Sequence, residues 1–285
     1  MADTQNVIYA QAYSRNIMQL AQQKYSKLLN TVYIKPNVRG KTFFQDQIGQ
    51  WSMSAKGGRN VQTPNNDPAL ARRMGTLVDY HDNRLLDRGD ELRSISDPRS
   101  AYTIAAAQSL GRKIDDVILA ALVGTSYSGE TGTTSNTLSS TQVSSGTGMA
   151  LSFGIVRDTK KILDNADIEA EERFFVVSPG ALESLLGASE ATSADYNSVK
   201  SLIRGEIDTW MGFKWITSTR LDNTSSTRTC IAYHRYGLCL AMGDAPLVRT
   251  DERSDLSYSW QVYYELNIGA VRLEEERVVK VLTDD

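Results

Sequence analysis

Apolar side chains recur every three or four residues between Pro98 and Val123, and this spacing predicts one long amphipathic helix over residues 98–123. Asp97 suits the position that caps a helix start, and Pro98 suits the first helical position, where its missing N–H costs nothing. Gly124 is placed to end the helix. At about 1.5 Å per residue, about 26 residues form a rod of about 39 Å. The apolar stripe consists of Ile104, Ala107, Leu110, Ile114, Val117, Ile118 and Leu122.

Residues 5–29 carry a second helical pattern. The polar face of this segment carries Gln19, Gln22, Gln23 and Lys27, and the apolar face consists of Ile17, Leu20, Ala21, Tyr25 and Leu28. Pro36 and Gly40 then separate the predicted helix from the next segment of the chain. The pattern alone favours a helix that packs on the core of the chain.

Residues 31–76 predict a long hairpin-like segment with little helix. Short stretches of partly alternating polarity, TVYI and KTFFQDQIGQWSMSA, read as strands. Between them and beyond lie many turn residues: Pro36, Gly40, Gly49, Gly57, Gly58, Pro64, Pro68 and Gly75. A loop of this length inside a compact domain is commonly an interaction element.

Residues 124–150 are rich in Gly, Ser and Thr and poor in bulky apolar side chains, which predicts a flexible surface loop. A phosphate-binding interpretation fails, because the chain contains neither GxxxxGK[ST] nor GxGxxG.

The second half of the chain mixes helices and strands. We expect helices at 152–165, at SPGALESLLG with Ser178 as its cap, and near 195–204. Strands are expected at ERFFVVS, within GEIDTWMGFKWITSTRL, as a pair in TCIAYHRYGLCLAMG broken by Gly237, and through the last 25 residues or so. No regular βαβ spacing is present, so the predicted fold class is α+β.

Composition narrows the class of protein. The 285 residues carry a formal net charge of −3, which argues against a chain whose whole surface wraps nucleic acid. The two cysteines, Cys230 and Cys239, are too few for a disulfide framework. No run of 18 apolar residues occurs, so no membrane-spanning helix is expected. The N-terminus lacks the pattern of a secretory signal, which predicts that the protein stays in the cytoplasm where it is made.

The sequence shows no catalytic motif. Its two histidines, His81 and His234, lie in different predicted regions, and no GxSxG turn exists to place a nucleophile. Cys230 and Cys239 lack the CxxC spacing of structural zinc. The acidic turn formed by Asp164, Asp167, Glu169, Glu171 and Glu172 does not match an EF-hand loop and is interpreted as solvated. We therefore predict no enzyme activity, no cofactor and no metal.

Several blocks of the chain, in order, resemble the major capsid proteins of tailed bacteriophages, which have the Hong Kong 97-type shell fold. The most specific block is DPRSAYTIAAAQSLGRKIDD, which resembles the start of the long "spine" helix of that family. SPGALESLLG, GEIDTWMGFKWITSTRL and NIGAVRLEEERVVKV resemble later passages of the same fold. Each piece is unspecific alone, and their order carries the resemblance.

The resemblance implies a shell subunit built from an N-terminal arm, an extended loop, a peripheral domain with the spine helix, and an axial domain. Those parts would cover residues 1–40, 41–76, 77–150 with 246–285, and 151–245, respectively. The arm would pack on a neighbouring subunit. The implied function is an icosahedral shell around the phage genome, in the virion capsid, assembled in the host cytoplasm.

The implied partners are copies of the chain itself in hexamers and pentamers, a portal, and packaged double-stranded DNA in non-specific contact. The family often carries a long region ahead of the arm, and this sequence shows none before residue 40. A separate scaffolding protein is therefore expected.

Five residues are candidates for subunit contacts. Aromatic side chains and arginines are enriched at interface anchors, which points to Phe43, Phe44 and Trp51 in the extended loop. Arg84 and Arg88 belong to a segment whose charges alternate in sign between Asp79 and Arg93. That segment is either a solvated connector or a charge network between subunits, and the sequence leaves both open.

Two other functions remain as alternatives. One is an encapsulin-type bacterial compartment, which has the same fold and would carry a cargo-docking groove. The other is a soluble hydrolase or binding protein with a conserved pocket, which no motif supports. Neighbouring genes would separate the first alternative from a phage shell, and a discrete monomer would favour the second.

Overall fold

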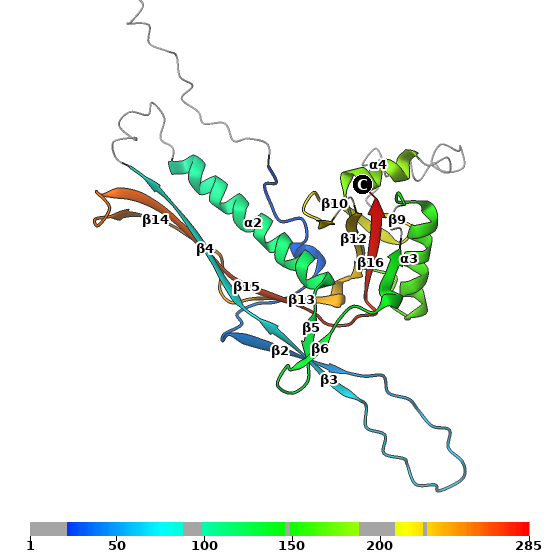
Figure 1. The fold of residues 1–285 in the computed structure, drawn as a ribbon. Coiled ribbons are helices and arrows are strands. Elements are labelled where there is room, and N and C mark those ends of the chain that lie inside the picture. Colours follow the sequence, from blue (N-terminus) through cyan, green and yellow to red (C-terminus); the bar gives the residue numbers. More distant parts are fainter. Residues whose placement is uncertain (1–21, 88–98, 146–148, 188–208, 225–226, 285) are drawn as a thin grey trace, which may run out of the picture. The chain divides into compact units, whose positions relative to one another are not determined.

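A computed structural model of the chain describes residues 22–87, 99–145, 149–187, 209–224 and 227–284. The chain divides into two compact units. Unit 1 comprises Met1–Ser26, Asp79–Arg112 and Ala245–Leu266, and unit 2 comprises Lys27–Val78, Lys113–Asp244 and Asn267–Asp285. Helices and strands are mixed, so the α+β prediction is confirmed (Figure 1).

The largest sheet belongs to unit 2 and holds its core. Its order is β7-β16-β12-β8-β10-β9, with β11 beside β12. All five residues of the central strand β8 are buried, as expected for a strand covered on both faces. Helix α3 contacts β16 and β7. The elements are β7 (Val143–Ser145), β16 (Val278–Asp284), β12 (Thr227–His234), β8 (Arg173–Val177), β10 (Phe213–Thr217), β9 (Thr209–Trp210), β11 (Asn223–Thr224), α3 (Phe153–Asn165) and α4 (Pro179–Gly187).

A second sheet is organised by the long strand β15 (Ser259–Arg272). Within unit 2, residues 268–272 of β15 pair with β13 (Leu238–Met242), which in turn pairs with β1 (Tyr33–Lys35). Within unit 1, residues 259–265 pair with β14 (Leu247–Arg253), and β4 (Val78–Leu86) also pairs with β15. The predicted β-rich chain end is thus confirmed.

The third sheet lies in unit 2 and has the order β2-β3-β5-β6. Its first two strands, β2 (Thr42–Ile48) and β3 (Leu70–Thr76), form an antiparallel hairpin, as the sequence predicted. Figure 1 shows the chain between them as a long excursion without helix or strand. The other two strands are β5 (Ser126–Ser128) and β6 (Thr134–Asn136).

The long helix is confirmed as α2 (Arg99–Val123), which ends just before Gly124. The stripe prediction holds for Leu110, Ile114, Ile118 and Leu122, which are buried. It is wrong for Ile104, which is 53% exposed, and for Ala107, which is exposed. The predicted caps Asp97 and Pro98 lie outside the described residues.

The predicted helix over residues 5–29 is wrong where the structure describes it. Residues 22–28 are not helical, and only a short 3-10 turn, η2 (Leu29–Thr31), follows them. The backbone N–H groups of Lys27 and Leu28 donate to the buried carboxylate of Asp115, at 3.1 Å each, so they are not used in a helix. The remainder of this prediction, and the helix expected near 195–204, lie outside the described residues.

Residues 124–150, predicted as a flexible loop, depart from that prediction at four short elements, where the prediction is wrong. These are β5, β6, the 3-10 turn η3 (Ser140–Gln142) and β7. Hydrogen bonds of hydroxyl, amide and main-chain groups stabilise these elements in place of buried apolar side chains. For example, Asn136 Nδ2 donates to Ser128 Oγ at 2.7 Å. The fully buried guanidinium of Arg272 donates to the carbonyls of Gly124 and Asn136.

The apolar strands around Gly237 are present, but they do not pair with each other. Strand β12 belongs to the seven-stranded sheet and β13 to the sheet of β15, with the 3-10 turn η4 (Arg235–Gly237) between them. An added Cβ at Gly237 would meet Arg277 and Val278 atoms at 3.2 Å, which explains a glycine at this crowded corner. Helix α4 begins as predicted, because Ser178 Oγ accepts the N–H of Ala181 at 3.0 Å.

Candidate assembly interface

The hairpin β2–β3 is fixed at its root by contacts within unit 2. Lys35 Nζ donates to the Phe44 carbonyl at 2.9 Å. Arg73 donates from Nε to the Leu273 carbonyl at 2.8 Å and from Nη2 to Glu275 Oε2 at 2.7 Å. These charge-assisted bonds hold both strands near their attachment to the core. The root of the hairpin is therefore anchored, while strand pairing ends at Ile48 and Leu70.

Phe43 is a core residue, so its prediction as an interface anchor is corrected. Its ring is 4% exposed and packs in a cluster with Leu77, Cys239, Val271 and other residues. It lies directly over Gly75, where an added Cβ would come within 2.3 Å of the ring. The first of two adjacent aromatic residues thus faces inward, as period-two alternation along a strand requires.

Phe44 and Trp51 have the accessibility that an anchor needs. Phe44 is half-buried, with the guanidinium of Arg72 over its ring at 5.4 Å. Trp51 is 70% exposed on the excursion beyond the strands. Arg72 also pairs with Asp46 at 2.5 Å, and this hydrogen bond lowers the pKa of the Asp46 carboxyl, so the pair stays ionised to a lower pH than a free aspartate would.

The structure adds apolar residues that the sequence reasoning missed. Ile48 and Leu70 face each other across the hairpin and are 75% and 78% exposed, and Met53 is fully exposed. Val61 is also exposed. The strand period could have identified Ile48, because it shares a face with Phe44 two strand repeats earlier. We call Ile48, Trp51, Met53, Val61 and Leu70 the hairpin apolar set.

The hairpin apolar set has the character of an interaction surface. Single exposed apolar residues are ordinary, but a concentration on one protruding segment marks an interaction surface. All residues from 49 to 67 on the same segment are exposed. The hairpin can therefore bind another protein surface through apolar contact, while its root keeps it attached to a fixed core.

The charged segment before α2 is only partly described. The guanidinium of Arg84 lies over the Tyr102 ring at 5.8 Å, and Asp82 accepts the hydroxyl of Tyr264 at 2.8 Å, both within unit 1. Arg88 lies outside the described residues. Both interpretations of this segment therefore stay open.

Carboxylates of the acidic turn, which the sequence predicted to be solvated, form ion pairs with arginines. Asp164 pairs with Arg173 at 2.6 Å, Glu169 with Arg277 at 2.8 Å, and Glu172 with Arg235 at 2.6 Å. The hydrogen bonds to Glu169, first from its own backbone and then from Arg277, lower the pKa of its carboxyl. Three of the five carboxylates predicted to be solvated are thus paired with arginine.

No catalytic constellation is found in the part of the chain that the structure describes. His81 and His234 belong to different units. Neither cysteine forms a disulfide and both are buried, and burial raises the pKa of the Cys239 thiol to about 11, which keeps it unreactive. Within the same described ranges, no three His, Cys, Asp or Glu side chains gather as metal ligands. None of the described helices has the length and apolar character needed to cross a membrane.

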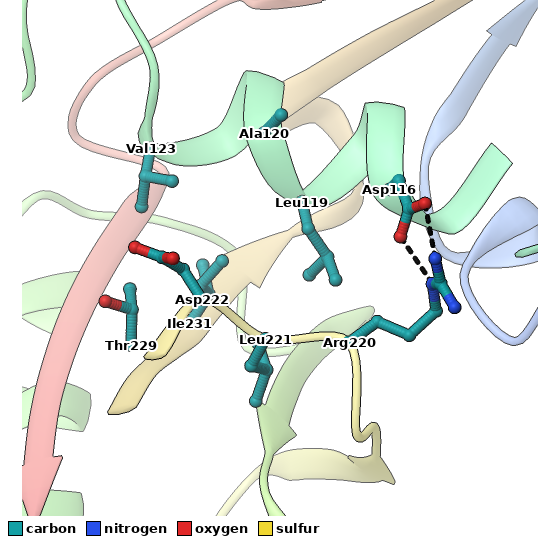
Figure 2. A pocket seen from close by; sticks show the side chains of 9 residues that line it. All are labelled: Asp116, Leu119, Ala120, Val123, Arg220, Leu221, Asp222, Thr229 and Ile231. Carbon is teal, nitrogen blue, oxygen red and sulfur yellow. Dashed lines mark hydrogen bonds and ion pairs between the residues drawn. The ribbon is translucent and has the colours of Figure 1, made fainter. Parts of the chain in front are cut away.

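A small pocket beside α2 also lacks a catalytic arrangement of side chains. It has a volume of about 350 Å³ and is lined mainly by apolar side chains, including Leu119, Leu221 and Ile231. Figure 2 shows the ion pair of Asp116 and Arg220 at one end and Asp222 at the other. Arg220 Nη2 donates to Asp116 at 2.6 Å, and this hydrogen bond raises the pKa of the guanidinium. The pocket lining includes no nucleophile beside a base.

Comparison with known proteins identifies relatives over the whole length. Residues 6–285 match the family described as "Phage capsid protein". The fold is similar to that of a chain in the structure of Mycobacterium phage Che8. The sequence identity is 18%, the match covers 96% of this chain and 97% of that chain, and the TM-score is 0.74. The fold is also similar to the capsid of Ralstonia phage GP4, with 11% identity, 100% and 97% coverage, and a TM-score of 0.77. The capsid of the cyanophage P-SCSP1u gives 13% identity, 97% and 93% coverage, and a TM-score of 0.76. No curated protein matches the sequence.

Proposed function

This chain belongs to the phage capsid protein family and is a major capsid protein with the Hong Kong 97-type shell fold, and we propose that its copies associate through the hairpin apolar set. The observation that carries the proposal is the concentration of exposed apolar side chains on a hairpin whose root is fixed by Lys35 and Arg73. Among the earlier candidates, Trp51 belongs to this set, the half-buried Phe44 is proposed to extend the contact beside it, and the buried Phe43 is not part of it.

The energetics suit a shell. Burying one large apolar side chain stabilises a contact by about 1.5–3 kcal/mol before the cost of ordering the hairpin. Such a contact is modest alone, but each subunit of a closed shell makes several, so the assembly persists through multivalency. A weak repeated contact also allows misplaced subunits to dissociate and rebind.

Further parts of the proposal rest on the family. We infer that copies form hexamers and pentamers, that a separate scaffolding protein and a portal take part, and that assembly takes place in the host cytoplasm before the shell becomes the virion capsid. Packaged double-stranded DNA would meet the shell by non-specific contact. The role is structural and not catalytic. The family match favours this function over an encapsulin-type compartment.

The domain boundaries expected from the sequence also remain a proposal. The arm over 1–40, the extended loop over 41–76, the peripheral domain over 77–150 and 246–285, and the axial domain over 151–245 are functional regions of a shell subunit. Arg84 is proposed to contribute to a charge contact between subunits, together with Arg88. Reversing Arg84 to Glu should impair assembly while the subunit stays folded.

The decisive experiment places charge in the proposed apolar contact. The double variant Ile48→Asp with Leu70→Asp alters two exposed side chains that face each other, so folding should persist while the desolvation of two carboxylates opposes association. The matched control is Gln50→Asp, which adds charge at an exposed polar position of the same segment. Particle yield is measured by light scattering and electron microscopy, and folding by circular dichroism.

We expect folded subunits with few or no particles for the double variant and normal particles for the control. Normal particles from the double variant would remove the hairpin apolar set from the interface. Loss of particles from both variants would show that any added charge on this segment is harmful, and the proposal for these apolar residues would fall.

A further inference from the structure

Two connections between sheets of unit 2 meet at one corner. Strand β12 pairs with β16 in the seven-stranded sheet, and β13 pairs with β15 in the second sheet. The chain passes from β12 to β13 through η4 and from β15 to β16 through residues 273–277. These strands therefore form a two-stranded ribbon that leaves one sheet and enters the other, with η4 and the 273–277 turn side by side at its corner.

Main-chain hydrogen bonds hold the two sides of the corner together. The N–H of Leu273 donates to the Gly237 carbonyl at 2.9 Å, and the N–H of His234 donates to the Arg277 carbonyl at 3.0 Å. The N–H of Arg235 donates to the Glu172 carbonyl at 3.1 Å, which adds the turn before β8 to the same joint. Three chain segments thus meet around the last residue of β12.

The side chain at the centre of this joint is His234, which is 3% exposed. Its Nδ1 accepts the N–H of Tyr236 at 3.3 Å and lies 3.1 Å from Arg277 Nη1, which is always a donor. Its Nε2 lies 3.8 Å from Glu169 Oε2. The two donors on Nδ1 require an unprotonated nitrogen there, so the contacts specify the neutral imidazole with its proton on Nε2.

The charges around the imidazole come from every segment of the joint. The turn before β8 contributes Glu169 and Glu172, and β8 contributes Arg173. Arg277 is closest, and it also binds Glu169 and Glu274. Burial, and next the charge of Arg277, lower the pKa of His234, while the two glutamates oppose this shift.

We propose that His234 makes this corner sensitive to acid. The neutral imidazole holds η4 against the 273–277 turn, and its protonation releases this contact. A proton from solvent binds Nδ1, which then can no longer accept from Tyr236 or face Arg277. The imidazolium is more stable in water than in the closed joint, so protonation favours the open corner. Because the closed corner lowers the pKa of His234, the closed corner is most stable above the ordinary histidine pKa of 6.5 and loses stability as the pH falls below that value.

The chain supplies its own reporters. It has two cysteines, and Cys239 on β13 lies two residues after the corner, whereas Cys230 lies inside β12 of the seven-stranded sheet. Both are buried, and neither forms a disulfide. Their reaction with 4,4′-dithiodipyridine, a reagent that works in acid, is measured by mass spectrometry on the purified full-length protein. Each rate is divided by that of the guanidinium-unfolded chain at the same pH.

Between pH 7.5 and 5.5 the protection of Cys239 should fall by up to about ten-fold, the ceiling set by the ordinary histidine pKa in the open state. Cys230 should stay protected. His81→Gln removes the other histidine and should leave the fall unchanged, whereas His234→Asn keeps an acceptor near the position of Nδ1 and should abolish it.

A second variant keeps the test informative if His234→Asn does not fold. Glu169→Gln removes an exposed carboxylate that favours protonation in the closed corner, so the fall in protection should still begin near pH 6.5 and should be at least as large, continuing to lower pH. The proposal is overturned if the wild type shows no fall, if His234→Asn retains it, if the fall in Glu169→Gln is smaller than in the wild type, or if Cys230 loses protection together with Cys239.

Discussion

Replacing Arg272 with Met should be among the most damaging single changes in unit 2. Its side chain is fully buried at the end of β15. Nη1 donates to the carbonyls of Leu122 and Gly124 at 2.9 and 2.6 Å, and Nη2 donates to the carbonyl of Asn136 at 3.1 Å. One guanidinium thus satisfies the free carbonyls at the end of α2 and links them to β6.

The magnitude is set by these bonds. A hydrogen bond to a charged group contributes about 1.5–3 kcal/mol, and a carbonyl that is left buried without a donor costs about 1–3 kcal/mol. Met recovers part of the packing of the arginine stem, and the loss of a buried charge removes its desolvation cost. We therefore expect the free energy of unfolding to fall by about 3–5 kcal/mol. Arg272→Lys should lose about half as much, because an ammonium cannot reach all three carbonyls at once.

The assay is reversible guanidinium unfolding of the dissociated subunit, followed by tryptophan fluorescence. Arg72→Met is the control, because Arg72 pairs with Asp46 in an exposed position and its loss should leave the unfolding midpoint unchanged. A loss below about 1 kcal/mol for Arg272→Met would refute the view that this arginine completes the helix end.

Two further predictions concern single positions. Asp115→Ala removes the acceptor of two backbone N–H groups and should cost about 2–4 kcal/mol in the same assay, whereas Asp116→Ala breaks only the half-exposed pair with Arg220 and should cost less than about 1 kcal/mol. Equal losses would contradict the different roles of these neighbours. Gly75→Ala should destabilise by about 1–3 kcal/mol because its Cβ would overlap the Phe43 ring, while Gly57→Ala meets nothing within 4 Å and should be neutral by thermal unfolding.

Local patterns predicted the regular elements well. The period of α2, the cap at Ser178 and the apolar strand β8 each depend on neighbours in the chain, so a single sequence reveals them. The predictions that were wrong concern segments whose structure is determined by residues far away in the sequence. Residues 22–28 would suit a helix by periodicity, but Asp115 binds the backbone N–H groups of Leu28 and Lys27 from 87 and 88 residues away. Residues 124–145 lack a hydrophobic pattern, and polar contacts such as those from Arg272 to Gly124 and Asn136 stabilise them instead.

The hairpin that carries the proposed interface was predicted from the sequence, but only some of its exposed side chains were. An extended hairpin could be inferred from turn residues and alternation, and Trp51 is exposed as an anchor must be. The choice between Phe43 and Phe44 required the direction of the strand relative to the core. The exposure of Ile48 and Leu70 required their register, which turn residues alone do not set.

The most direct test of self-assembly is the size and shape of the purified protein. The chain is expressed with and without a neighbouring scaffold-like gene, separated by size-exclusion chromatography with light scattering, and the largest fraction is imaged by electron microscopy. A shell subunit predicts closed particles of many copies, with the scaffold improving their yield and uniformity. A uniform small species under both conditions would contradict self-assembly into a shell.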